Sequence, residues 1–157
     1  GTLINYFIFP PNMKKELIES IENMYLTFRD ILEYIVWEEE NLSLDGLRKN
    51  LITIEENYNI LKKDIKLNLF KGHDSFDFEY IFELFESTYN HFSILCSIDK
   101  CLYIDEDNRQ ILERLFNKKL PVQIEQKKDN LSLVYNYHLE KILYGLISIN
   151  NIIHNID

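Results

Sequence analysis

The strongest constraint on the fold is a repeat of apolar residues between positions 44 and 65. Seven apolar side chains alternate spacings of three and four residues without a break: Leu44, Leu47, Leu51, Ile54, Tyr58, Leu61 and Ile65. This repeat is typical of a long amphipathic helix that packs nearly antiparallel to a neighbouring helix. We expect the helix to end near Phe70, because Gly72 can adopt the left-handed conformation of a C-cap.

Helical periodicity extends over four more segments of the chain. Helices are expected at about residues 13–39, 74–100, 107–118 and 130–155. No segment shows the alternation of apolar and polar residues that a strand requires. The sequence therefore predicts an all-α fold, an antiparallel bundle of four long helices and one short helix, 107–118. With 157 residues, the chain is long enough for one domain, which we place at residues 12–157.

Local residues indicate where two of these helices begin, end or approach a neighbour. Two prolines precede the first helix and leave Asn12 as its N-cap. Residues Glu38–Glu40 would be unfavourable at a helix C-terminus, so this helix is expected to end near Trp37. Gly145 is costly in the middle of the last helix, and we interpret it as a close approach to another helix beneath an aromatic ring.

Charge and cysteine content exclude some classes of protein. The formal net charge is −9, which argues against a surface for nucleic acid or anionic lipid because both would be repelled. The two cysteines, Cys96 and Cys101, cannot form a disulfide framework. They lie five residues apart on one expected helix and would face different directions, so we interpret them as the reduced thiols of a cytosolic protein.

Metal-binding patterns are not visible in the sequence. A di-iron bundle needs Glu-x-x-His pairs, and Glu83 and Glu86 lack a histidine at the required offset. The acidic run Asp105–Asn108 lacks the glycine and distal glutamate of a calcium loop and is more typical of a helix N-terminus. The histidines show no paired spacing and are interpreted as isolated surface or hydrogen-bonded side chains. They are His73, His91, His138 and His154.

No cofactor or enzymatic activity is therefore expected. The four scattered glycines cannot build a phosphate-binding loop. Neither cysteine has a neighbouring histidine in the sequence, although a partner in space stays open. A distant relation to the phosphate-regulator bundles, which bind metals through acidic residues spaced i, i+4, is a minor alternative.

The segment 74–100 carries a stripe of aromatic residues that admits two interpretations. Its members are Phe78, Phe82, Phe85, Tyr89 and Phe92. We favour a role in the hydrophobic core, because bulky aromatic side chains bury large areas in a bundle. A pocket for an aromatic acid is the alternative, and its carboxylate would need a cation. Arg109 and Arg114 are the arginines in this half of the chain, but we expect both to face solvent, so no ligand-binding residue is assigned.

Residues 3–9 form a short apolar and aromatic stretch in front of the first helix. Together residues 1–11 read as a lead-in to the domain, either an arm packed on the bundle or the end of a transmembrane helix that precedes it. In the second case Tyr6 would lie at the membrane interface, and Lys14 and Lys15 would lie on the cytoplasmic side.

The junction Asn5-Tyr-Phe-Ile-Phe-Pro-Pro-Asn12, followed by a long amphipathic helix, resembles the start of the C-terminal domain of the aromatic acid exporter family of low-GC Gram-positive bacteria. The order of later features is similar as well: a second helix that ends near Asn68-Leu-Phe70, an aromatic-rich third helix, and a loop with Leu120-Pro121 before a long last helix. The resemblance spans the whole chain and rests on this order and the one junction.

The resemblance implies a function. It makes the chain the cytoplasmic C-terminal domain of a membrane exporter of aromatic acids, with a regulatory or assembly role. The parent protein would lie in the cell membrane, with its own membrane-spanning half as partner, and self-association and an aromatic carboxylate ligand would fit the same role. The alternative is a free-standing soluble helical regulatory or interaction protein without a membrane half.

Overall fold

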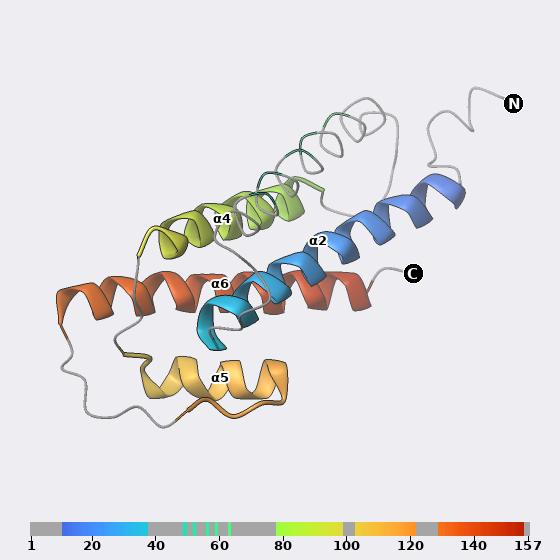
Figure 1. Cartoon of the computed structure of the whole chain (residues 1–157). Helices are drawn as coiled ribbons and strands as arrows, with labels where there is room; N and C mark the ends of the chain where they lie inside the picture. Colours follow the sequence, from blue (N-terminus) through green and yellow to red (C-terminus); the bar gives the residue numbers. More distant parts are fainter. Residues whose placement is uncertain are drawn as a thin grey trace, which may run out of the picture.

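The computed structural model describes residues 11–37, 78–98, 103–121 and 129–155, and five isolated positions between 49 and 63. Over these residues it contains four helices and no strand, which confirms the all-α class. The helices are α2 (Pro11–Trp37), α4 (Phe78–Cys96), α5 (Glu106–Phe116) and α6 (Asn130–His154) (Figure 1).

All seven residues of the apolar repeat at 44–65 lie outside the described residues. The five isolated positions are helical and exposed, and none belongs to the repeat: they are Lys49, Ile52, Glu56, Asn59 and Lys63. The second long helix, and with it the bundle of four long helices and one short, stays a prediction.

α4 and α6 lie side by side and form the most extensive helix pair among the described elements (Figure 1). They run antiparallel, because His91 contacts His138, whereas Thr88, one turn earlier on α4, meets Gly145, two turns later on α6. α2 crosses this pair, and α5 packs along α6 and runs in the same direction as α6 (Figure 1). The expected antiparallel arrangement therefore describes α4 and α6 and not α5.

Aromatic side chains join α2 to α4 in the core. The ring of Phe28 stacks on Phe92, with centroids 5.1 Å apart and planes at 8°, and on Phe85 at 6.0 Å and 23°. These three rings are at most 1% exposed. The core interpretation of the aromatic stripe is thus confirmed for Phe85 and Phe92, and Tyr89 packs half-buried against the same core. The side chains of Phe78 and Phe82 lie outside the described set.

The short helix α5 is attached to its neighbours at both ends. Near its N-terminus the buried Asn108 donates from Nδ2 to the backbone oxygen of Asn136 on α6, at 3.0 Å. Near its C-terminus the Phe116 and Trp37 rings form a T-shaped contact with centroids 5.1 Å apart, and Trp37 Nε1 donates to the oxygen of Lys119. α5 therefore connects the last turn of α2 to the first half of α6.

Several helix boundaries follow the sequence and others do not. α2 is described from Pro11 to Trp37, so Asn12 lies inside the helix and the expected cap at Asn12 is wrong. The residues after Trp37 lie outside the described set, so the expected end of the helix near Trp37 stays a prediction. Proline is well suited to the first helical position because its fixed φ is helical and its missing N–H needs no partner. α4 ends at Cys96, so it does not reach Cys101 and the expectation that both cysteines share one helix is wrong.

The two C-terminal helices begin at acidic caps. The Asp105 carboxylate accepts a hydrogen bond from the Asn108 N–H at 2.9 Å, and Asp129 accepts one from the Ser132 N–H at 2.8 Å. Asp107 lies in the first turn of α5. The acidic run at 105–108 is thus a helix N-terminus, as the sequence indicated.

Residues 1–10 lie outside the described residues, so the two interpretations of the lead-in remain predictions. None of the described helices is both long and apolar enough to cross a membrane.

Candidate functional site

Two histidines from different helices meet between α4 and α6. His91 Nδ1 lies 2.8 Å from His138 Nδ1, and the ring centroids are 5.1 Å apart at 45°. The sequence shows no paired histidine spacing, because these residues are 47 positions apart and only helix packing joins them. His154 is exposed at the end of α6, and His73 lies outside the described residues.

The contact limits the protonation of the pair, because the two rings cannot both carry a hydrogen on Nδ1. A hydrogen bond between two Nδ1 atoms needs one ring that donates an N–H and one that accepts through a lone pair. Burial lowers the pKa of both rings, and His138 and Lys141 lower the pKa of His91 further. Near neutral pH the pair is therefore uncharged, with the rings in opposite tautomers.

Tyr137 and Lys141, both on α6, complete the surroundings of the pair. The Tyr137 ring makes T-shaped contacts with both imidazoles, with centroids 6.1 Å from His91 and 5.2 Å from His138. Lys141 Nζ lies 5.5 Å from the centre of the Tyr137 ring. A positive charge is thus held beside the pair, which disfavours protonation of the imidazoles.

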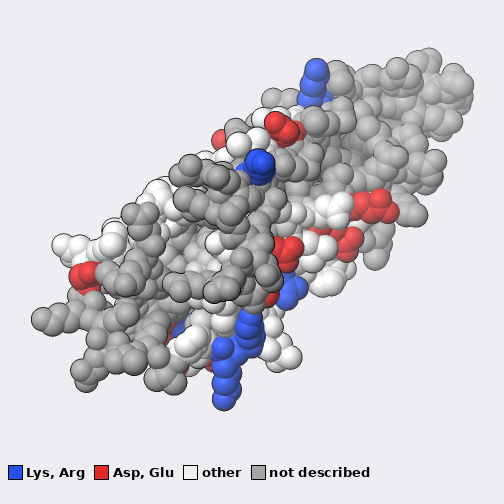
Figure 2. Space-filling model, in the orientation of Figure 1, with Lys and Arg blue, Asp and Glu red and all other residues white. Residues whose placement is uncertain are grey.

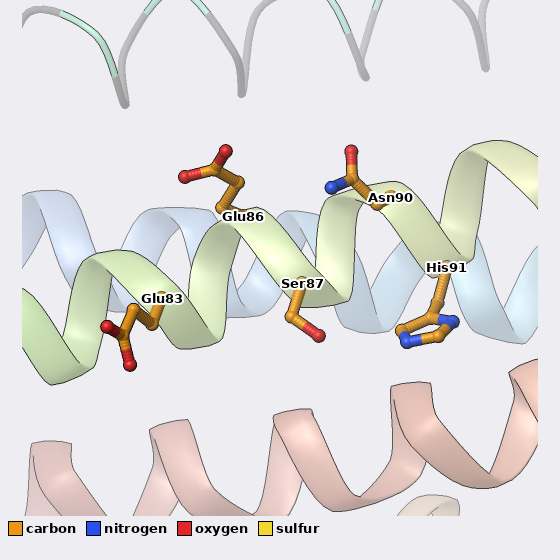
Figure 3. A pocket seen from close by; sticks show the side chains of 5 residues that line it. All are labelled: Glu83, Glu86, Ser87, Asn90 and His91. Carbon is orange, nitrogen blue, oxygen red and sulfur yellow. The ribbon is translucent and has the colours of Figure 1, made fainter.

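A shallow depression of about 330 Å³ runs along α4 up to His91. It is lined by Glu83, Glu86, Ser87, Asn90 and His91 (Figure 3). Glu83, Ser87 and His91 point to the side of α4 that faces α6, whereas Glu86 and Asn90 point to the opposite side (Figure 3). The depression is open and polar and carries two carboxylates, so its chemistry does not match an aromatic carboxylate, which the negative charges would repel.

Arg109 is used inside the fold and not at a ligand site. Its Nη2 donates to the backbone oxygens of Leu120 and Pro121, at 3.0 and 2.7 Å, and its Nε donates to Glu113 at 3.2 Å. The expectation that Arg109 faces solvent is therefore wrong, since its side chain is 21% exposed. Arg114 is exposed, as expected.

The remaining candidates for chemistry are weak in this fold. Within the part of the chain that the structure describes, no three histidine, cysteine or acidic side chains converge as a metal site would require. Burial raises the pKa of the Cys96 thiol to about 11. Cys96 is therefore a thiol and not a nucleophilic thiolate near neutral pH.

Charges of both signs lie on the described part of the face in Figure 2, with several basic side chains gathered at its lower edge. The geometry thus defines an all-helical domain whose most distinctive polar feature is the histidine pair. No family model, curated protein or solved structure matches this chain. The resemblance to the exporter domains consequently rests on the sequence alone.

Proposed function

We propose that this chain is a helical interaction domain, the cytoplasmic C-terminal domain of a membrane exporter of aromatic acids, which assembles or regulates the membrane-spanning half. The proposal includes the predicted bundle, in which residues 44–70 supply a further long helix. The helical state of the isolated positions between 49 and 63 supports that part of it.

The observation that carries an interaction role is an apolar row on the outside of α6. Leu133, Tyr137 and Tyr144 are spaced by four and seven residues, which places them on one helix face. Each is more than half exposed, although these are large side chains. Exposed apolar rows of this kind are typical of surfaces that bind another protein segment. The membrane-spanning half and a second copy of this domain are the partners that the proposal names.

An aromatic carboxylate ligand has less support. Phe85 and Phe92 fill the core, and the depression beside His91 carries Glu83 and Glu86. Enzymatic activity is not part of the proposal, because the Cys96 thiol is held protonated and no motif in the sequence supplies another nucleophile.

Cell fractionation with an antibody against this domain tests the proposal. A membrane-bound protein much larger than the 18.9 kDa of this chain is the expected result. A soluble protein of 18.9 kDa would overturn the exporter assignment and favour the free-standing helical regulator.

The apolar row is tested separately by a triple variant with serine at Leu133, Tyr137 and Tyr144. We expect this variant to lose association with the membrane half, or self-association in sedimentation, while its helical content is kept. The matched control places serine at Glu19, Glu22 and Asn23, three exposed positions on α2. Equal association of both variants would exclude the α6 row as the interface.

A further inference from the structure

We propose that the hydrogen bond between His91 and His138 is a pH-sensitive latch that holds α4 to α6 until both rings become protonated. The inference does not depend on the proposed function, because it follows from the geometry of the pair alone.

The proton count gives the latch its threshold. In the neutral pair one ring carries its hydrogen on Nδ1 and donates it to the bare Nδ1 of the other, 2.8 Å away. A first added proton binds Nε2 of the donor ring and leaves the shared bond in place, strengthened by the positive charge. A second proton has to bind the acceptor Nδ1. Two N–H groups then face each other across the same gap, and two positive charges repel.

The surroundings favour the closed state near neutral pH. On α6, Lys141 adds a positive charge that opposes protonation, and Tyr137 packs against both rings. On α4, the carboxylates that line the same depression are Glu83 and Glu86, more than one helical turn from His91. The charges that act on the His91 pKa are His138 and Lys141, and both lower it.

The sign of the linkage is the same for both rings. Their pKa values in the folded chain lie below the ordinary histidine value of 6.5. The unfolded chain therefore binds more protons than the folded chain when the pH falls below about 6.5, and folding stability decreases in that range. Because the two sites interact, the pair titrates with two macroscopic midpoints, and the latch opens at the lower one.

The position of the pair determines what opening would disturb. Thr88 lies one turn before His91 and packs directly against Gly145. Phe92 follows His91 in the chain and stacks on Phe28 in the core. Loss of the shared bond therefore weakens the α4–α6 contact beside the centre of the core. We expect α4 and α6 to separate locally at acidic pH before the chain unfolds globally.

Side-chain NMR of the whole chain with labelled histidine tests the latch directly. The expected spectrum near neutral pH has one of the two rings as the Nδ1–H tautomer and the other as the Nε2–H tautomer, and the lower of the two midpoints lies below the ordinary histidine value of 6.5. Amide exchange in α4 and α6 around the pair should rise at the lower midpoint. Two Nε2–H tautomers would overturn the proposal, because neither ring would then donate through Nδ1.

Thermal unfolding of variants gives an independent readout. Glutamine can either donate or accept, so His91→Gln keeps a partner for His138 in both protonation states. The melting temperature should fall as the pH is lowered from about 7.5 to about 5. We expect this fall to be smaller in His91→Gln and in His138→Gln than in the wild type, by roughly 2 °C or more. His154→Gln changes an exposed histidine on the same helix and should follow the wild type. An equal loss in the wild type and all three variants would overturn the latch, and the NMR test stands even if a variant does not fold.

Discussion

Thr88 of α4 and Gly145 of α6 meet without room for a side chain between them. A β-carbon placed on Gly145 would overlap Thr88 Oγ1, and it would lie 3.3 Å from Thr88 Cβ and 3.4 Å from Cγ2. Glycine is therefore required at position 145 by the approach of α4, since the helical backbone of α6 does not itself need it. This contact allows the two helices to come close enough for His91 and His138 to share a hydrogen bond.

Gly145→Ala should destabilise the fold. The added methyl group collides with Thr88, and overpacking of this kind costs about 1–3 kcal/mol, which exceeds the gain of up to ~1 kcal/mol from alanine's helix propensity. Urea unfolding of the variant measures the loss. Thr88→Ala in the same chain removes the Oγ1 and Cγ2 atoms and should restore much of the free energy of unfolding that Gly145→Ala loses. The double-mutant cycle should therefore show strong coupling between the two positions. Additive effects would mean that the two residues do not limit the helix spacing.

The Asn136 side chain should be the most costly polar group to remove. Its Oδ1 accepts from the Asp105 N–H and from Asn108, and its Nδ2 donates to the oxygens of Tyr103 and Ser132. Asn136→Ala leaves several of these buried groups without partners, so we expect a loss of about 3 kcal/mol in the free energy of unfolding. Urea unfolding should separate this variant clearly from its control, Asn151→Ala, which changes an exposed asparagine on the same helix. Equal stability of the two would show that the amide does not fasten α5 to α6.

Phe92→Ala should destabilise the chain by about 3–5 kcal/mol, because it empties a buried site that the Phe28 ring stacks on. Tyr144→Ala is the control, since that ring is 54% exposed and its removal should cost less than about 0.5 kcal/mol. Chemical denaturation without any ligand measures the free energy of unfolding of both variants and of the wild type. A Phe92→Ala chain of wild-type stability would argue against the core role and revive the pocket interpretation of the aromatic stripe.

The helices were predictable from sequence because each rests on local information. The stripe that runs through Phe28 on α2 and the long apolar face of α6 have the period of 3.6 residues, and the acidic run at 105–108 marks the start of α5. Gly145 also predicted correctly that another helix approaches α6 closely. The residue that packs against Gly145 was expected to be aromatic, but it is Thr88. The identity of this residue depends on the register between α4 and α6, which the sequence does not contain.

The candidate site depends on that register and was missed for the same reason. His91 and His138 stand alone in their own helices, and neither has a partner at a helical spacing. Once Thr88 is aligned with Gly145 in an antiparallel pair, positions 91 and 138 fall within about one turn of each other. Gly145 was therefore the one signal in the sequence from which the histidine pair could have been found. Arg109 was likewise misjudged, because its acceptors at Leu120 and Pro121 lie in a loop that returns along α5.

Glu113 should make the attachment of that loop sensitive to acid. Its carboxylate accepts from the Leu120 N–H at 3.1 Å and from Arg109 Nε at 3.2 Å. The Leu120 bond first, and then Arg109, hold the pKa of Glu113 below its ordinary value of 4.5. A lowered folded-state pKa means that its contribution to stability is present above about pH 4.5 and is lost as the pH falls through the folded value.

Glu113→Gln should therefore be less stable than the wild type near neutral pH and approach the wild type as the pH falls below 4.5 through the lowered pKa of Glu113, where the wild-type carboxyl becomes protonated. Thermal unfolding across this pH range gives the difference in stability between the two chains. Asp129, whose pKa is also lowered by its helix-cap hydrogen bonds, is present in both chains, so its contribution cancels in this difference. Glu140→Gln, an exposed change on α6, supplies the background. A constant difference between wild type and Glu113→Gln at all pH values would show that the carboxylate's charge does not hold the loop.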